Sequence, residues 1–392
     1  MQMVTQNPQD PAFVADPYPF YHRIRAMGDL VRWQDYDLTV ATSHAAVGAL
    51  IRDTRLGRET PEELRQTPPQ HLAPFYAVED HSMLELERPR HTRLRGLVLR
   101  AFTSRGIAAL APEIEALSHT LIDGFPAGPF DLLDRYARHV PVIVIARLLG
   151  VPEATAPDLL RWSGAMTGMY RAGRTLADEV AAAGAAADFS DFLRDHIDRR
   201  RRDPGDDLLS HLIAAHADGD RLSEPEMIAT AILLLNAGHE ATVHALGNAV
   251  NVLLGTRMRP DDPAATVEEA LRFDPPLHLF TRWVYEPLTF MGHDFARGDR
   301  VGLLLGATNR DPSVYEDPDR FDPGRWARHA PAPHLAFGAG PHFCVGAPLA
   351  RMEMQIALRV LFDRCPDLAL AEQPQVADIY HFRGLRRLLV TT

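Results

Sequence analysis

The amino-acid sequence predicts a mainly α protein that carries a small β-rich lobe. One long helical pattern occupies the middle of the chain, and an alanine-rich run at 181–187 favours a second helix. Alternating apolar runs, which indicate strands, are short and fall on either side of that pattern. We therefore expect a single domain over 1–392. Its β-rich lobe is expected to consist of about 28–45, 283–305 and C-terminal strands. Its helical lobe is expected to consist of about 90–275 and 347–362.

The strands are predicted from alternation. Apolar residues alternate at 30–33 and 36–42, and the polar pair between these runs indicates a hairpin. Similar runs predict strands at 283–290 and 301–305.

The helices are predicted from their end signals. Ser223 and Glu226 have the spacing of a capping box, so we expect a helix from there to Leu254. Another helix ends at Phe273, where an aspartate and two prolines follow, and a last helix spans 347–362. The segment 311–333 is rich in prolines and turns, and such a long irregular stretch within a compact chain is usually functional.

Charge and composition exclude several classes. The 392 residues carry a net charge of −11, which argues against a nucleic-acid binder because phosphate contacts need clustered basic charge. The arginine run 199–202 is flanked by aspartates, so we expect a solvated loop there. The first 16 residues are polar and contain no signal-peptide or membrane-anchor pattern, and the two cysteines fit a reducing compartment. The sequence therefore predicts a cytoplasmic protein.

Two familiar motifs are excluded by spacing. Gly338 and Gly340 are followed by Phe343 where a dinucleotide-binding loop needs its third glycine. His239 and Glu240 begin like a zinc-protease motif, but His244 lies five residues after His239 and therefore about 140° around the helix. The two imidazoles cannot share one metal ion.

A cysteine lies in a glycine-rich loop directly before a predicted helix. Backbone N–H groups at a helix N-terminus favour a thiolate, so we expect a lowered pKa for Cys344 and a good soft ligand. The glycines allow the backbone to approach a flat cofactor closely. A lone cysteine could instead be a small buried apolar residue.

The residues around this cysteine resemble those of a known family. The run Phe337-Gly338-x-Gly340-x-His342-x-Cys344-x-Gly346, followed by Leu349-Ala350-Arg351-x-Glu353, is similar to the haem-thiolate loop of bacterial cytochrome P450 enzymes. Four further segments match the family in order: His91-Thr-Arg-Leu-Arg95, Ala237-Gly238-His239-Glu240, Glu269-Ala-Leu-Arg272, and the stretch from Asn309 to Arg325. The resemblance covers nearly the whole chain and implies the triangular, prism-like helical haem domain of that family.

The resemblance also implies a cofactor and the residues that hold it. The cofactor is haem b, with Cys344 as the iron ligand. The implied cofactor-binding residues are His91, Arg95, Arg282, His342, Phe337, Gly338, Gly346 and Ala237. Glu269, Arg272 and Arg325 are expected to form a buried network behind the loop. Other interpretations remain open: a surface pair for Glu269 and Arg272 with a capping box at Thr266, a solvated face for Arg95, and core positions for the two histidines.

The implied activity is monooxygenation by a soluble enzyme. One oxygen atom of O2 is expected to enter a hydrophobic small organic molecule, with electrons from a separate ferredoxin and ferredoxin reductase that draw on NAD(P)H. Basic residues near the loop could receive the donor: His342, Arg351, Arg95, Arg100 and Arg105. The pocket residues implied by resemblance are Leu233, Ala237, Leu279, Phe280 and Phe382.

The catalytic segment departs from the family pattern. Relatives commonly have an acid and then a threonine, whereas this chain has Glu240, Ala241 and then Thr242. Thr242 is rotated by about 100° from the alcohol position and is expected to point away. We hypothesise that water or a substrate hydroxyl completes the proton relay with Glu240. Two alternatives stay open: a peroxide-driven peroxygenase, and a non-catalytic haem sensor in which His239 is the second iron ligand.

Overall fold

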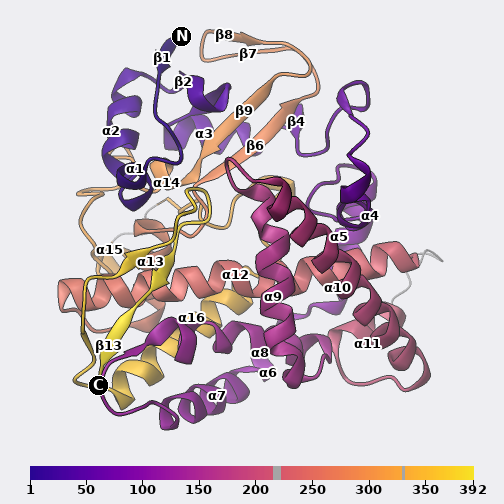
Figure 1. Cartoon of the computed structure of the whole chain (residues 1–392). Coiled ribbons are helices and arrows are strands. Elements are labelled where there is room, and N and C mark those ends of the chain that lie inside the picture. Colours follow the sequence, from indigo (N-terminus) through magenta and orange to yellow (C-terminus); the bar gives the residue numbers. More distant parts are fainter. Residues whose placement is uncertain (215–221, 329–331) are drawn as a thin grey trace.

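A computed structural model describes residues 1–214, 222–328 and 332–392 (Figure 1). Its longest helix, α12 (Glu224–Thr256), crosses the whole molecule and contacts helices on several sides. The predicted capping box is present, because the Ser223 side chain accepts from the Glu226 backbone and Glu226 reaches back to Ser223. The helix runs two residues past the predicted end and stops at Arg257, which has a left-handed backbone.

The remaining helices are α1 (Pro11–Ala15), α2 (Tyr18–Met27), α3 (His44–Leu50), α4 (Ala73–Glu79), α5 (Arg90–Ala101), α6 (Ser104–Ala109), α7 (Ala111–Asp123), α8 (His139–Leu149), α9 (Ala156–Thr167), α10 (Leu176–Arg202), α11 (Leu208–Ala214), α13 (Pro263–Phe273), α14 (Leu305–Thr308), α15 (Arg325–Arg328) and α16 (Ala347–Arg364). Of these, α4, α8–α11, α13 and α16 contact α12, whereas α1–α3 and α14 lie beside the sheet of the small lobe (Figure 1). Short 3₁₀ turns are η1 (Gln34–Tyr36), η2 (Glu62–Leu64), η3 (Gln70–Leu72), η5 (Glu153–Thr155), η6 (Gly168–Tyr170) and η7 (Gly340–His342), and η4 (Leu133–Ala137) is a π-helical turn. The mainly α fold class is confirmed, and the alanine-rich run lies within α10.

A six-stranded sheet forms the small lobe beside the helices (Figure 1). Its strands, in spatial order, are β1 (Gln2–Val4), β2 (Leu30–Trp33), β3 (Leu38–Ala41), β9 (Arg300–Leu304), β6 (Leu279–Val284) and β4 (Leu56–Gly57). The smaller sheets use β5 (Phe130–Asp131), β7 (Leu288–Phe290), β8 (His293–Phe295), β10 (Ala369–Leu370), β11 (Gln375–Val376), β12 (Leu385–Arg387) and β13 (Leu389–Thr391). The lobe is therefore built from strands within residues 2–57 and 279–304, whereas the C-terminal strands β10 and β13 form a sheet with β5 and pack against the helical core, so their expected place in the lobe is wrong.

The predicted strands are found with shifted bounds. β2 and β3 pair antiparallel as the expected hairpin, but η1 occupies the first residues of the second predicted strand. The prediction of one strand over 283–290 is wrong. β6 ends at Val284, and Pro287, which has no N–H to donate to a ladder, precedes a separate hairpin of β7 and β8. The short strands β1, β4 and β5 were not predicted.

The arginine run at 199–202 is the last turn of α10, so the predicted loop is wrong. Cationic side chains are favourable at a helix C-terminus because they face the negative end of the backbone dipoles. The flanking aspartates are ion-pair partners: Arg200 lies 2.9 Å from Asp207, and Arg201 lies 2.9 Å from Asp198. The run is neutralised locally.

A buried ionic network joins α13 to the irregular segment that follows the sheet. Arg272 donates to both carboxylate oxygens of Glu269 at 2.8 Å, and both side chains are fully buried. Arg325 and the Trp326 indole also donate to Glu269, at 3.2 and 3.0 Å. Arg272 additionally donates to backbone carbonyls of Asn309, Pro318 and Arg320. The surface-pair interpretation is therefore wrong, and so is a capping box at Thr266, because α13 is capped by Asp262.

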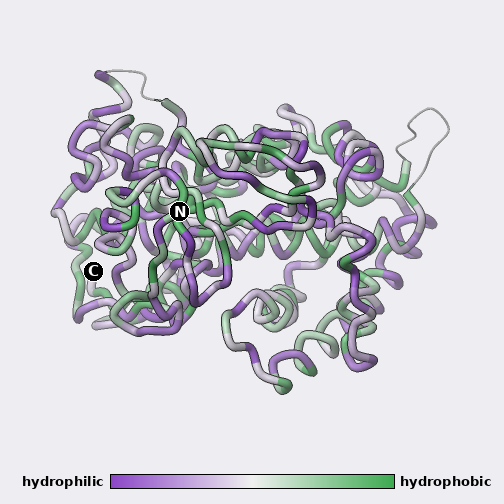
Figure 2. Tube along the Cα trace, turned by 90° about the horizontal axis from the view of Figure 1, so that it is seen from above, coloured by the Kyte–Doolittle hydropathy of each residue, from purple (hydrophilic) through white to green (hydrophobic). Residues whose placement is uncertain are grey.

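Apolar and polar positions alternate along most helices, as Figure 2 shows. Each helix therefore turns one face to the core and another to solvent. Within the described ranges, no helix combines the length and the apolar character that crossing a membrane requires.

One acidic side chain lies inside the helical core without a partner. Glu353 on α16 is 1% exposed, and neither carboxylate oxygen has a hydrogen bond among the described residues. Burial raises the pKa of Glu353 well above its usual value. The folded protein therefore holds this side chain as a neutral acid.

Glu353→Gln is expected to stabilise the fold, increasingly so at higher pH. The unfolded carboxyl loses its proton above about pH 4.5, whereas the folded one keeps it. Wild type should therefore lose stability relative to the variant by up to about 1.4 kcal/mol per pH unit above that value. Thermal unfolding midpoints at pH 5 and pH 8 measure this, with exposed Glu62→Gln as the control. An equal effect of Glu353→Gln at both pH values would show that the acid is ionised in the core.

Candidate functional site

The cysteine loop ends where α16 begins. The loop is closed by the Cys344 N–H, which donates to the Phe337 carbonyl at 3.0 Å. Gly338 and Gly340 have φ values of 67° and 69°, and a Cβ on Gly340 would lie 2.8 Å from the Ile51 carbonyl oxygen. Backbone N–H groups of Gly346 and Ala347 point at the Cys344 sulfur. The sulfur therefore occupies the N-terminus of an 18-residue helix.

The expected lowering of the Cys344 pKa is wrong for the protein alone. Burial raises the pKa of this thiol more than the two N–H groups and the nearby Arg95 and Arg351 lower it. The local pattern favours a thiolate, but the surroundings of the loop disfavour any unpaired charge. A metal cation at the sulfur would supply the missing positive charge.

Small side chains in the middle of α12 are accessible, although most of this helix is buried. Ala237 is exposed, and Leu233 and Ala241 are half-buried, whereas the positions from Ala245 to Val250 are all buried. Two of these accessible side chains are no larger than a methyl group. The helix therefore leaves room against one face of its middle, where a flat group could lie.

Four basic side chains lie around the cysteine loop. Arg95 on α5 donates to the Phe343 carbonyl at 2.7 Å. The rings of His91 and His342 stack with centroids 4.3 Å apart. Arg282 on β6 is 3% exposed, and its one hydrogen bond among the described residues goes to the Thr281 carbonyl.

Arg282 is a buried cation without a described carboxylate partner. Burial lowers the pKa of Arg282 to about 10, and the neighbouring Arg58 adds to this. His91 also lacks a partner, because its buried Nδ1 forms no hydrogen bond among the described residues. Burial and His342 lower the pKa of His91 to about 4. The site is therefore short of negative charge and of hydrogen-bond acceptors.

His342 differs, because it already has a carboxylate partner. Its Nε2 lies 2.9 Å from an oxygen of Glu87, which also accepts from the Arg58 backbone N–H at 2.8 Å. Burial opposes ionisation of Glu87, but these contacts hold its pKa below the usual value. The interpretation of His342 as a satisfied core histidine describes its present contacts, and Glu87 was not identified from the sequence.

Glu240 lies among polar groups on α12 and α9. Its carboxylate oxygen is 3.6 Å from His239 Nε2, and the buried Ser163 hydroxyl, otherwise without a described partner, also faces it. Burial favours the neutral acid, but His239, His244 and Ser163 together lower the pKa of Glu240. Thr242 is buried and donates to the Gly238 carbonyl at 3.5 Å, so its hydroxyl faces the helix backbone, as expected.

His239 does not present an imidazole to the loop as a ligand would. It is 1% exposed, its Nδ1 bonds the Leu235 carbonyl at 2.6 Å, and its Nε2 faces Glu240. Both nitrogens therefore face α12 groups, which disfavours the sensor interpretation.

The structure separates the predicted pocket residues. Phe280 lies beside the cysteine loop, where a Cβ on Gly338 would be 3.5 Å from its ring. Leu279 packs against a different hydrophobic cluster, with Val40 and Leu304 of the sheet. Neighbouring residues of a strand point to opposite faces, so the assignment of Leu279 to the pocket is corrected. Phe382 lies 6.3 Å from the ring of Tyr170, on the turn after α9.

A polar group near Phe280 was missed by sequence reasoning. Arg58 and Arg282 both lie 5.8 Å from the Phe280 ring, and Arg58 pairs with Glu85. Tyr170 donates to Glu79 at 3.2 Å. Burial and then Glu85 raise the pKa of Glu79 to about 8. These residues come from four separate segments, so no sequence motif unites them.

The predicted basic surface is also smaller than expected. Arg351 donates to Glu268 at 3.0 Å and lies over the Phe337 ring at 4.5 Å, so its charge is paired. Burial opposes ionisation of Glu268, but His334 and Arg351 hold its pKa at about 2. Arg100 and Arg105 are exposed and form no ion pair within the described part of the chain.

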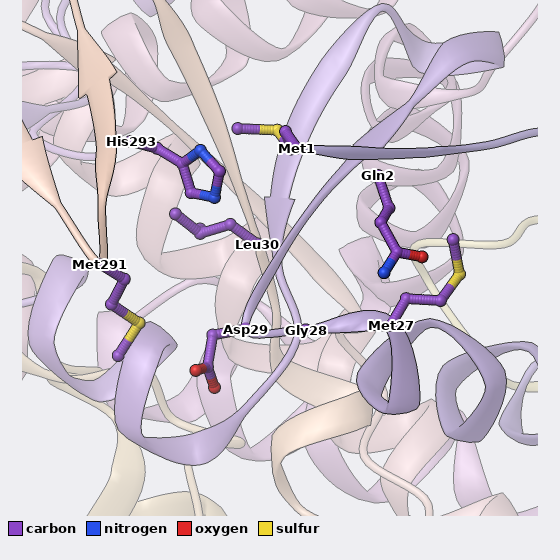
Figure 3. A pocket seen from close by; sticks show the side chains of 8 residues that line it. All are labelled: Met1, Gln2, Met27, Gly28, Asp29, Leu30, Met291 and His293. Atoms are coloured by element: carbon purple, nitrogen blue, oxygen red, sulfur yellow. The ribbon is translucent and has the colours of Figure 1, made fainter.

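A hollow lies on the small lobe, away from the cysteine loop (Figure 3). It is lined by Met1, Gln2, Met27, Gly28, Asp29, Leu30, Met291 and His293. None of these belongs to the predicted site.

The residues around Cys344 fit a haem. The sulfur is a soft ligand at a helix N-terminus, α12 leaves room along its middle, and the buried Arg282 and His91 lack partners that two propionate groups would supply. Carboxylates can be buried only with such cationic or N–H partners.

Comparisons with known proteins agree with this geometry. The family model described as Cytochrome P450 matches residues 264–387. The chain is 39% identical to cytochrome P450 monooxygenase PikC of Streptomyces venezuelae, over 96% of this chain and 91% of that protein. It is 38% identical to a vitamin D(3) 25-hydroxylase of Pseudonocardia autotrophica, over 97% and 94% of the two chains.

Solved structures are similar over nearly the full length. The structure of P450BioI in complex with an acyl carrier protein ligated to hexadec-9Z-enoic acid has a TM-score of 0.90 and 32% identity, over 98% of this chain and 100% of that one. The structure of PksS, a cytochrome P450 of the bacillaene polyketide synthase of Bacillus subtilis 168, has a TM-score of 0.87 and 32% identity, over 98% and 99%.

Arg282→Leu should stabilise the cofactor-free protein but weaken its retention of haem. Removing a buried unpaired cation is expected to stabilise the cofactor-free fold by on the order of a few kcal/mol, because the desolvation penalty of that ion is removed. The same change should weaken retention of iron porphyrin, because a propionate partner is lost. Thermal unfolding measures the first effect, and the Soret-to-protein absorbance ratio after gel filtration the second.

Arg300→Leu is the matched control, since Arg300 is exposed on the adjacent strand. If Arg282→Leu retains haem as wild type does, Arg282 is not a propionate partner.

Proposed function

Because this chain belongs to the cytochrome P450 family and is a monooxygenase, we propose that it inserts one oxygen atom of O2 into a hydrophobic small organic molecule, with electrons from a ferredoxin and its reductase. We propose one haem domain over 1–392. Two free cysteines suit a reducing cytoplasm.

The observation that carries this proposal is the Cys344 sulfur at the start of α16, beside partnerless basic groups. When bound, a haem with a thiolate ligand supplies the activation of O2 that C–H oxidation requires. We assign haem b as the form. Cys344 would hold the iron, and His91, Arg95, Arg282 and His342 the propionates. Phe337, Gly338, Gly346 and Ala237 would contact the porphyrin faces.

Glu240 would hold and deliver a proton at its carboxylate oxygen. Its lowered pKa means that it carries this proton only briefly near neutral pH, so the proton must be resupplied. Ala241 offers no hydroxyl beside it, and the Thr242 hydroxyl is bonded to the Gly238 carbonyl. We therefore propose that water or a substrate hydroxyl accepts the proton from Glu240.

The substrate is proposed to be hydrophobic or amphipathic. Leu233, Ala237, Phe280 and Phe382 offer apolar contact, and small-molecule pockets are mostly apolar with a few polar groups. The polar group of Arg58, Glu79 and Tyr170 lies at the Phe280 and Phe382 end. A relative named for hydroxylating vitamin D(3) is consistent with an apolar substrate.

Oxygen-isotope labelling tests the proposed reaction. Compounds that shift the ferric haem to high spin are first selected, then turned over under ¹⁸O2 with ferredoxin, reductase and NADPH. The product should gain one ¹⁸O atom, whereas the other atom should appear in water. A second candidate, peroxide-driven oxidation, is favoured by Ala241. Product formation with hydrogen peroxide and none with reduced ferredoxin would replace the proposal with this alternative.

Charge reversal at Arg100 and Arg105 should slow reduction by ferredoxin. Both arginines are exposed and form no ion pair within the described ranges, and the neighbouring Leu99 is exposed as well. Arg100→Glu with Arg105→Glu should lower the reduction rate at least ten-fold at low salt, and the difference should shrink as salt rises. Stopped-flow formation of the reduced carbon monoxide complex measures the rate.

Arg135→Glu with Arg171→Glu, two exposed positions elsewhere, is the control. A rate unchanged by the first pair at all salt concentrations would exclude this docking face.

A further inference from the structure

A stripe of polar side chains follows α12 at every fourth residue. Asn236, Glu240 and His244 are each half-buried, and four residues bring a helix back to nearly the same face. The rest of α12 around them is largely apolar or buried. Polar side chains in such a position need partners or water, so the stripe offers a row of hydrogen-bonding groups along one face of α12.

His244 is the last residue of this stripe along α12 and is half-buried. Its imidazole packs against the backbone of Gly384, where a Cβ would lie 1.9 Å from Nδ1. Gly384 is therefore the residue that leaves space for this ring. Arg138, at the junction of η4 and α8, faces the same imidazole and is itself partly exposed.

His239 cannot perform the same role. It is 1% exposed, and its Nδ1 is occupied by the Leu235 carbonyl. It can orient Glu240, but it has no path to water within the described residues. Of the two histidines beside Glu240, only His244 is both close to the carboxylate and partly accessible.

We propose that His244 is the proton donor that recharges Glu240 from solvent. This inference rests on the proposed function and identifies the group that resupplies the proton to Glu240. A proton leaves the His244 imidazolium and joins a carboxylate oxygen of Glu240, and the neutral imidazole then takes a proton from water. No electrons move in this step.

The charges around the two groups suit the transfer. Burial, Arg138 and His239 lower the pKa of His244, whereas Glu240 raises it. Glu240 in turn is faced by His239, His244 and Ser163. An unperturbed imidazolium and glutamic acid differ by about 2 pKa units. A lowered His244 pKa makes its imidazolium a stronger acid, which favours release of its proton to Glu240.

The first test measures the linkage of the two groups without turnover. Ring-labelled histidine is followed by carbon-13 NMR in the diamagnetic carbon monoxide complex, and the His244 signal is identified by its loss in His244→Gln. Glu240→Gln should increase the acid dissociation constant of His244 at least three-fold, because a favourable negative charge is removed. Glu286→Gln, at an exposed position, should leave it unchanged. An unchanged His244 titration in Glu240→Gln would overturn the proposal.

The second test uses the pH profile of turnover. In wild type, the share of electron pairs released as hydrogen peroxide should rise with pH through the His244 pKa, because fewer imidazolium groups remain. His244→Gln should raise this share at least three-fold at pH 6 and remove its pH dependence. Gly384→Ala, which displaces the ring without removing it, should change the share in the same direction. His211→Gln on the exposed face of α11 is the control.

A wild-type peroxide share and pH profile in His244→Gln would overturn the proposal. Failure of the proposed function would look different. The reduced protein would then lack the thiolate carbon monoxide band, and the His244 titration could still be measured in the cofactor-free protein.

Discussion

The functional site depends on the sulfur of Cys344, which is half-buried at the start of α16, where its surroundings disfavour a bare thiolate. Two backbone N–H groups favour its charge, but burial outweighs them and raises the pKa of the thiol. An iron cation at the sulfur reverses this balance, since metal ligation deprotonates a coordinating thiol. The loop, its positive-φ glycines and the ionic network behind it all hold this one atom in place.

Other buried ionisable groups also need a partner of opposite charge, or else the neutral form is favoured. Glu269 is fully buried, and five donors from four residues satisfy its carboxylate. Arg282 is almost as buried and forms no ion pair with a described carboxylate, which supports our proposal that an anionic cofactor completes its site. Glu353 has neither partner nor cofactor and remains protonated. The three cases distinguish a structural network, a binding site and a neutral core acid.

Short-range patterns predicted much of the fold and the centre of the site. The capping box of α12 and the Cys344 loop depend on residues within a few positions of each other, so the sequence contains them fully. The wrong predictions concern features that depend on contacts between segments far apart in the sequence. The register of β6 in its sheet determines that Leu279 and Phe280 face opposite sides. Pro287 separates β6 from β7, although the alternation of apolar residues predicted one continuous strand. The Glu87 partner of His342 and the burial of Cys344 depend on loops packed from elsewhere in the chain.

The most direct measurement is the carbon monoxide difference spectrum of the reduced protein, compared with Cys344→Ser and Cys365→Ser. Cys365 is buried near the end of α16 and serves as a matched control. Wild type and Cys365→Ser should both give the long-wavelength Soret band of a thiolate-ligated haem, and Cys344→Ser should lose it. A haem that binds with the same band in Cys344→Ser, or a wild-type protein that binds no haem, would contradict the account.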